Sequence, residues 1–372
     1  MTDTQRVIYD TLLTNCKPDS NQNTQRFPYV NKYFIRNKTS PYENTNVGKT
    51  ALLQELYSRL DTANNLPATI NATGKNLIYF AIFLSDSYLD LVEYALQSIA
   101  DNTQNINFDV LFITDEEYKQ KLLQKPILTK FNCFFYITET PLSGVRASIR
   151  KLTVFDYPEI NQYEKILFLD CDAICIKDIN NIFNISILPE KLYTGTLKTV
   201  PPNEITTPTH GIMFLTGRDA EIYAKNYYNF KPFNAGQFLL YNTQRMKGHF
   251  ENVRWLIDNW PGELFFEQGP MNYYFVINSI SCILSTPDNN PVFAITHVSN
   301  RIKEQPRVGP VVVGATNTAC LTSVEALIKK VSIESFAATL NDDTCIVHFA
   351  GTPLGAEEKF KKIKEFVNAR KS

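Results

Sequence analysis

Apolar residues follow two different spacings along the central part of the chain. Continuous apolar runs, over 77–84, 108–114 and 165–169, are typical of strands buried on both faces of a parallel sheet. Between the first two runs, residues 88–99 carry apolar side chains at the spacing of an amphipathic helix. Alternation of strand and helix predicts a βαβ-type α/β fold with a mostly parallel sheet. The same reasoning predicts helices over 115–123, 148–155, 249–259 and 268–277, and strands over 133–137, 211–215 and 237–241.

The pattern divides the chain into three regions. Residues 1–75 are polar and rich in Asn and Thr, but 50–60 has helical spacing, with Thr50 as the predicted N-cap. We therefore expect a partly helical N-terminal extension that packs on the main domain. Residues 76–355 hold the alternating pattern and are predicted to form that domain. Residues 356–372 predict a C-terminal amphipathic surface helix.

Composition excludes several classes of protein. The 37 basic and 38 acidic residues leave a net charge of −1, so no basic excess is available for a face that binds nucleic acid. The seven cysteines form no CxxC pair, which argues against a zinc ribbon or a disulfide framework. The N-terminus has no apolar core of a signal peptide, and no apolar run is long enough to span a bilayer. We expect a cytoplasmic protein.

Two acidic residues, Asp170 and Asp172, directly follow the apolar run 165–169. In parallel α/β sheets, ligands bind at the carboxyl ends of the strands. In an extended segment, residues two apart point to the same side, so both carboxylates can face one cation. Carboxylate ligands suit Mg²⁺ or Mn²⁺, which can stabilise a diphosphate leaving group. A solvated turn with two acids is the alternative, and the position after a buried strand favours the metal site.

Five blocks of sequence resemble, in order, the motifs of the retaining family 8 glycosyltransferases, the glycogenin and galactinol synthase group. They cover about residues 76–355 and comprise FLSDSY (83–88), RKL with LFLDCDA (150–152 and 167–173), FNAG (233–236), EQG (267–269) and VHFAG (347–351). The resemblance implies a GT-A (Rossmann-like) fold. It also implies a metal-dependent retaining hexosyltransferase that uses a UDP-sugar and a hydroxyl acceptor (a glycan, a protein or a small polyol). Relatives in this family are often dimers, so a homodimer is a further expectation.

Carried over by position, the resemblance implies that Asp170, Asp172 and His348 bind Mn²⁺ (or Mg²⁺). It implies that Lys151 contacts the diphosphate or the transferring sugar, where a fixed cation would offset charge on the departing UDP. Three further histidines lie outside the motifs and receive no role: His210, His249 and His297.

The resemblance also implies a donor pocket. Tyr88 would stack on the uracil, with Ser85 and Asp86 beside the base and the ribose. The sugar and diphosphate end of this pocket is assigned to Asp170, Asn234, Ala235, Gly236 and Gly351.

For the EQG block, the resemblance implies that Gln268 lies under the β-face of the donor's anomeric carbon. A neutral amide is a poor nucleophile, so Gln268 suits a mechanism in which the acceptor attacks from the side that UDP leaves. Glu267 stands where the family usually has Asp, and it would orient sugar hydroxyls.

The family's diphosphate-binding lysine is replaced by Leu354, so either Lys359 or Lys361 substitutes or UDP binds more weakly. An insertion near 201–232 would shape acceptor binding.

Two alternatives compete with this interpretation. A nucleotidyltransferase also carries a metal-binding acid pair, but residues 77–88 lack the glycine-rich loop of that class. A degenerate transferase that serves as a binding or scaffold protein is favoured by Leu354 and Glu267. Asp170 and Asp172 oppose it, because two neighbouring carboxylates repel each other without a cation.

Overall fold

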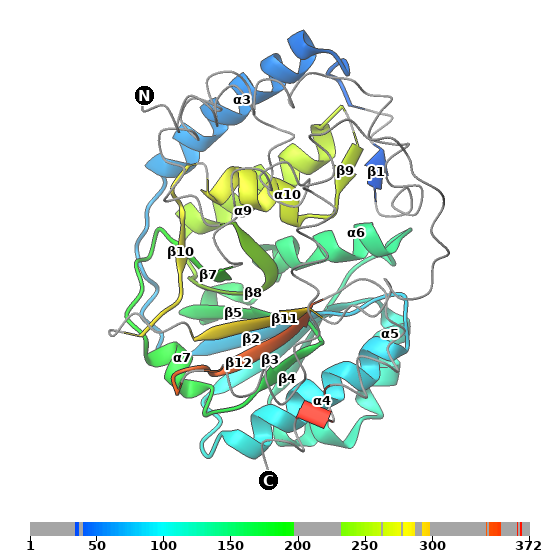
Figure 1. Cartoon of the computed structure of the whole chain (residues 1–372), viewed down its shortest axis with the longest axis vertical. Helices are drawn as coiled ribbons and strands as arrows, with labels where there is room; N and C mark the ends of the chain where they lie inside the picture. The colour runs from blue at the N-terminus through cyan, green and yellow to red at the C-terminus, as the bar shows by residue number, and fades with distance from the viewer. Residues whose placement is uncertain are drawn as a thin grey trace, which may run out of the picture.

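The structure is a computed structural model of the chain (Figure 1). It describes residues 34–36, 40–196, 232–261, 263–276, 278–286, 292–297, 340, 342–350, 363 and 365–366. In these parts of the chain, no helix combines the length and the apolar composition needed to cross a bilayer.

A seven-stranded sheet in the order β10-β7-β8-β5-β2-β3-β4 forms the centre of the molecule (Figure 1). Strands β5, β2, β3 and β4 are parallel, and β8 runs antiparallel between β5 and β7. The predicted α/β fold with a mostly parallel central sheet is confirmed. The strands are β2 (Asn76–Ala81), β3 (Phe108–Thr114), β4 (Cys133–Ile137), β5 (Lys165–Leu169), β7 (Leu192–Thr196), β8 (Phe233–Tyr241) and β10 (Ser281–Ile283).

Both faces of this sheet are covered, which explains the continuous apolar runs. Alternate residues of β2 enter opposite cores: Leu77 and Tyr79 on one face, Ile78 and Phe80 on the other. The first face is covered by α3 (Asn46–Asn65), α6 (Gly144–Ile149), η3 (Arg150–Asp156), α9 (Gln244–Asn259), α10 (Gln268–Met271) and the π-helical turn η9 (Asn272–Val276). The second is covered by α4 (Ser87–Asn102), α5 (Glu116–Leu123), η2 (Pro126–Lys130) and α7 (Asn180–Asn184).

Two small sheets complete the described structure. In the three-stranded sheet, β12 (Ile346–Ala350) lies between β11 (Phe293–His297) and β6 (Ala173–Cys175), parallel to the first and antiparallel to the second. The pairing brings the C-terminal motif back to the end of β5. A further antiparallel pair joins β1 (Phe34–Arg36) to β9 (Glu263–Phe265).

Strands 108–114, 133–137 and 165–169 are observed with the predicted bounds. The predicted N-cap Thr50 is wrong, because α3 begins at Asn46 and the Thr45 side chain accepts the Gly48 N–H at 3.1 Å. The predicted strand 77–84 is β2, which ends at Ala81. Shortly after it, the backbone turns at Leu84, whose φ is +65°.

The predicted helices 88–99 and 115–123 are confirmed as α4 and α5, and 249–259 is the C-terminal part of α9. The other predicted elements were located only in part. The helix 148–155 is a short α-helix followed by a 3₁₀ helix, and 268–277 is α10 continued by a π-helical turn. Strand 237–241 is the second half of β8. Strand 211–215 lies outside the described residues, as do all of 1–33 and most of 356–372. Within 356–372, the described residues Ile363, Glu365 and Phe366 are helical.

His249, to which the motifs gave no role, is a packed core residue of α9. Its Nδ1 lies 3.0 Å from the Tyr274 hydroxyl. Burial, together with the charges of Arg245 and Lys191, lowers the pKa of His249 to about 4, so the imidazole is neutral at physiological pH. His210 and the side chain of His297 lie outside the described residues.

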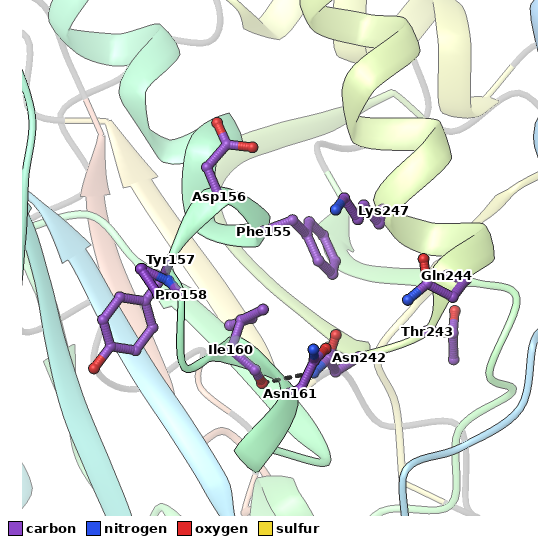
Figure 2. Close-up of a pocket in the computed structure, with 10 residues that line it drawn as sticks. All are labelled: Phe155, Asp156, Tyr157, Pro158, Ile160, Asn161, Asn242, Thr243, Gln244 and Lys247. Atoms are coloured by element: carbon purple, nitrogen blue, oxygen red, sulfur yellow. Dashed lines mark hydrogen bonds between the residues drawn. The ribbon is translucent and has the colours of Figure 1, made fainter.

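A cleft of about 270 Å³ opens at the amino-terminal edge of the sheet (Figure 2). It lies between the end of η3, the short helix η4 (Ile160–Gln162) and the start of α9. These segments precede β5 and follow β8, so the cleft lies at the edge opposite to the predicted site. The residues that line it include Asp156, Asn161, Gln244 and Lys247.

Candidate active site

Three side chains that the motifs assign to metal binding meet at the carboxyl end of β5. Asp170 follows β5 directly, and Asp172 lies just before β6. Because β12 pairs antiparallel with β6, His348 stands opposite Ala173 and therefore beside Asp172. The His348 Nε2 atom lies 3.0 Å from Asp172 Oδ1 and 3.6 Å from Asp170 Oδ2. Potential ligand atoms from all three residues lie within 4.8 Å of one another.

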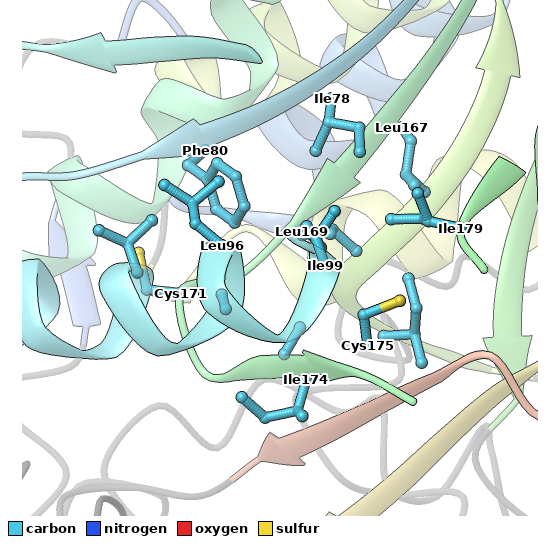
Figure 3. Close-up of a cluster of buried hydrophobic side chains, with 14 of the residues drawn as sticks. Ile78, Phe80, Leu96, Ile99, Leu167, Leu169, Cys171, Ile174, Cys175 and Ile179 are labelled. Carbon is cyan, nitrogen blue, oxygen red and sulfur yellow. The ribbon is translucent and has the colours of Figure 1, made fainter. Parts of the chain in front are cut away.

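The residue between the two acids fixes their direction. Cys171 is buried beneath α4, in the same core cluster as Ile174 (Figure 3). The segment is a turn, in which the Ala173 N–H donates to the Asp170 carbonyl at 3.0 Å, and not the extended segment that the sequence suggests. With Cys171 anchored in the core, the turn leaves both carboxylates on the side of His348.

The chemistry of this cluster fits a hard divalent cation. Asp172 and His348 are buried, and the Asp170 side chain is 35% exposed. Two carboxylates and an imidazole form an acceptable Mn²⁺ ligand set. Burial raises the pKa of Asp170, and the nearby Lys151 and His348 act in the opposite direction. The His348 Nδ1 is buried and has no hydrogen-bond partner among the described residues.

Gly236 on β8 makes the space in which these ligands meet. Its carbonyl accepts the Asp170 N–H at 2.7 Å, because β8 runs antiparallel to β5. A Cβ at this position would lie 2.1 Å from His348 Cε1 and 2.7 Å from Asp170 Oδ2. Only glycine lets the strand approach so closely. The resemblance assigned Gly236 to the donor pocket, and the structure shows that side chains of the metal-type cluster also lie against it.

Gly236→Ala is therefore expected to weaken Mn²⁺ binding roughly tenfold or more. The free energy of unfolding should fall by about 1–3 kcal/mol, because the added methyl group must displace a ligand side chain. Metal titration and thermal unfolding measure the two effects. Gly144→Ala is the matched control, since no atom lies within 4 Å of a Cβ built there. If Gly236→Ala binds Mn²⁺ as tightly as the wild-type protein, the close approach of His348 and Asp170 to this position is contradicted.

Lys151, near the start of η3, is a buried cation whose hydrogen bonds are all made within the protein. Its Nζ lies 2.8 Å from Glu267 Oε1, 3.1 Å from the Ala235 carbonyl and 3.3 Å from Asp170 Oδ1. A lysine ammonium has three donors, and these acceptors use all of them. Burial alone would lower the pKa of Lys151, but the two carboxylates outweigh burial and raise it. Lys151 therefore ties Asp170 to Glu267.

The EQG residues reach the same cluster from the start of α10. Glu267 is buried, and its Oε2 has no hydrogen-bond partner within the described parts of the chain. Gln268 Oε1 accepts the Ala235 N–H at 3.3 Å. Asn272 was not predicted as a site residue. Its side chain accepts the Phe233 N–H at 2.8 Å and donates to the Phe233 carbonyl at 2.9 Å. These paired bonds hold the end of α10 against β8. The signal available in the sequence was an asparagine four residues after Gln268, one helical turn further along.

The residues predicted to surround the base lie between the end of β2 and the first turn of α4. Since β2 is parallel to β5, this segment leaves the same edge of the sheet as Asp170. Ser85 Oγ lies 2.6 Å from Ser87 Oγ, the Asp86 carboxylate accepts from Lys121 at 2.6 Å, and Tyr88 is 44% exposed. Asn234 Oδ1 accepts the Gly236 N–H at 2.7 Å. The other predicted positions, Gly351, Leu354, Lys359 and Lys361, lie outside the described residues, as does 201–231.

The model of glycosyl transferase family 8 matches residues 80–253. This stretch contains Lys151, the Asp170–Asp172 pair and Gly236, and the ordered motifs continue beyond it to His348. Residues 80–253 thus match the family that the motifs predicted. The α/β architecture with a mostly parallel seven-stranded central sheet is the one that the resemblance implied.

Solved structures of glycosyltransferases are similar to the chain at low sequence identity. The galactosyltransferase LgtC in complex with donor and acceptor sugar analogues has a TM-score of 0.47 at 12% identity, over 78% of this chain and 95% of that one. The bifunctional glycosyltransferase WbbM has a TM-score of 0.44 at 13% identity, over 80% and 51%. GlyE of Streptococcus pneumoniae TIGR4 has a TM-score of 0.41 at 13% identity, over 77% and 60%. A search of curated proteins found no match.

Proposed function

We propose that the chain is a metal-dependent retaining glycosyltransferase that transfers a hexose from a UDP-sugar to a hydroxyl acceptor. The observation that carries the proposal is the convergence of Asp170, Asp172 and His348 within 4.8 Å in a family 8 glycosyltransferase. These residues would hold Mn²⁺ or Mg²⁺. The cation, when bound, supplies charge that stabilises the diphosphate of the leaving UDP.

The chain's own residues would divide the remaining work. Lys151 holds Asp170 and Glu267 in fixed positions through its bonds to both carboxylates. The second oxygen of Glu267, Oε2, is an acceptor for a donor sugar hydroxyl.

The mechanism follows from the chemistry of Gln268. Its side chain is a neutral amide, and Gln268 Oε1 already accepts a bond from Ala235. An amide that is a poor nucleophile does not favour a covalent intermediate. We therefore propose that the acceptor hydroxyl attacks from the face that UDP leaves, with retention of configuration.

The donor would lie along the carboxyl edge of the sheet, from β2 to β8. Ser85, Asp86 and Tyr88 would contact the nucleoside, next to the metal ligands at the end of β5. The sugar would lie against Asn234, Ala235 and Gly236, with Gly351 at the diphosphate.

The test is release of UDP from a panel of UDP-sugars without acceptor, with Mn²⁺ and with excess chelator. Release from one UDP-sugar is expected, and chelator should abolish it. The first anomer of the freed sugar, observed by NMR, should retain the configuration of the donor. An Asp172→Asn preparation made in parallel controls for contaminating hydrolases. If the wild-type protein shows no UDP release and also no Mn²⁺-dependent UDP binding, the proposal is contradicted. That result would favour a scaffold protein instead.

A further inference from the structure

The chain reaches Glu267 through a backbone conformation that phenylalanine rarely adopts. Phe266, between β9 and Glu267, has a φ of +47°, in the left-handed region that favours glycine. The Phe266 side chain packs against the core beneath α9. A left-handed backbone in such a residue persists only where the surrounding structure imposes it. The chain must therefore be held on both sides of Phe266.

The candidate active site itself holds the chain on the downstream side. Glu267 is buried and joined to Lys151 at 2.8 Å, and Gln268 accepts a backbone N–H of β8 at 3.3 Å. If the upstream side were free, residues 263–266 could rotate to relieve the strain at Phe266. The element that holds this upstream side therefore helps to decide how Glu267 and Gln268 are presented.

On the upstream side, the chain is held by β1. The three residues of β1 pair antiparallel with β9, with Phe34 opposite Phe265 and Arg36 opposite Glu263. Within the described parts of the chain, β9 has no other strand partner. Pairing of this kind fixes the backbone of both strands through main-chain hydrogen bonds. The strand that leads into the turn thus depends on a segment near the other end of the sequence.

The same segment also contacts the element that leads to Lys151. Strand β1 lies against α6, the helix that runs directly into η3 and Lys151 (Figure 1). Beyond β1, the Ser40 hydroxyl donates to the Asn259 carbonyl at 2.6 Å, at the end of α9. The chain around β1 therefore joins the elements from which Lys151 and Glu267, the two partners of the buried ion pair, are presented.

We propose that β1 is a positioning strand for the candidate active site. Its pairing with β9 holds the left-handed turn at Phe266 and thereby keeps Glu267 in contact with Lys151. The inference rests on the proposed function, and it adds an element from outside residues 80–253, the stretch that matches the family. The groups assigned to the metal and the nucleoside come from other elements, β5, β12 and the start of α4. Loss of the pairing should therefore slow the reaction much more than it weakens UDP binding.

The test is Ile35→Pro/Arg36→Pro in the full chain. Of two consecutive residues in an antiparallel strand, one directs its N–H toward the partner, so two prolines remove a pairing hydrogen bond whichever residue donates it. Ile35→Ala/Arg36→Ala is the matched control, because it changes the same side chains and keeps both N–H groups. The proline variant should slow donor hydrolysis about tenfold or more and keep Mn²⁺-dependent UDP binding within about threefold of the wild type. The alanine variant should keep most of the rate.

Hydrogen exchange of the ligand-free protein tests the positioning without an enzyme assay. In the proline variant, amides of 263–272 should exchange about tenfold faster or more than in the wild type, and those of β5 should be unchanged. Unchanged exchange in 263–272, a wild-type rate of hydrolysis, or equal effects of the proline and alanine variants would overturn the inference.

Faster exchange throughout the protein, β5 included, would also overturn the inference, because the pairing would then serve the whole fold and not the site. If the wild-type protein releases no UDP from any UDP-sugar and binds none, the proposed function falls. The exchange comparison then still decides whether β1 holds the segment that carries Glu267.

Discussion

Asp172→Ala is expected to abolish Mn²⁺-dependent UDP binding and to lower turnover roughly a thousandfold, the effect of losing several kcal/mol of charge stabilisation. Asp172 is buried, and its Oδ1 lies 3.0 Å from His348 Nε2. Among the described residues, the cluster has only one other carboxylate, that of Asp170. Removal of this carboxylate leaves two ligands, too few to hold the cation against water. Titration of UDP with and without Mn²⁺, together with donor hydrolysis, measures the loss.

The same variant distinguishes a metal site from a structural cluster. In excess chelator, the wild-type protein keeps two neighbouring carboxylates that repel each other, and Asp172→Ala relieves that repulsion. Loss of the contact between Asp172 and His348 at 3.0 Å offsets this gain, so the thermal midpoint in chelator should be nearly the same for both proteins. Asp101→Asn, on the exposed end of α4, is the control for loss of one surface charge. A large drop of the midpoint in chelator would mean that the acids are structural, and the metal assignment would fall.

The central sheet could be predicted because its strands are buried on both faces. The runs 108–114, 133–137 and 165–169 became strands with the predicted bounds, since a continuous apolar run has few other stable settings. Helix starts were harder. Thr45 and Thr50 are both good N-caps, and only the packing of α3 on α9 shows that the helix extends back to Thr45.

The motifs predicted which residues of the candidate site come together, but not how each acts. Lys151 bonds groups from β5, β8 and the start of α10, and no local pattern reveals that all three of its donors are used. Gly236 reads as a glycine that a ligand approaches, yet the neighbouring atoms are those of His348 and Asp170. Interactions between distant segments decide both roles, so they became visible only in the fold.

The Leu84 turn shows the same limit in a local feature. The sequence FLSDSY contains no glycine, and positive φ is not expected from leucine. The turn follows from tertiary constraints, with Ile82 and Phe83 fixed in the two cores and Ser85 leading into α4. A pattern of residue types does not carry that information.

Lys151→Met is expected to lower the free energy of unfolding by about 3–5 kcal/mol, because it leaves the buried Glu267 carboxylate and the partly exposed Asp170 carboxylate without their cation. Lys151 and Glu267 are 5% and 6% exposed, and they are joined at 2.8 Å. The ammonium also lies 4.6 Å from the centre of the Phe168 ring, so the aromatic face adds to its stabilisation. Chemical denaturation of the ligand-free protein measures the loss, and donor hydrolysis should be lost with it.

A second substitution separates the two roles of this ion pair. In Lys151→Met, the additional change Glu267→Gln removes one of the unpaired charges, so the double variant should recover part of the lost stability. It should not recover donor hydrolysis, because neither a charged Glu267 nor an oriented Asp170 is restored. Lys151→Arg keeps the charge in a larger and planar group, and it should lie between the wild type and Lys151→Met in stability. If Lys151→Met is as stable as the wild type, or if the double variant is no more stable than Lys151→Met, the buried pair does not position the site.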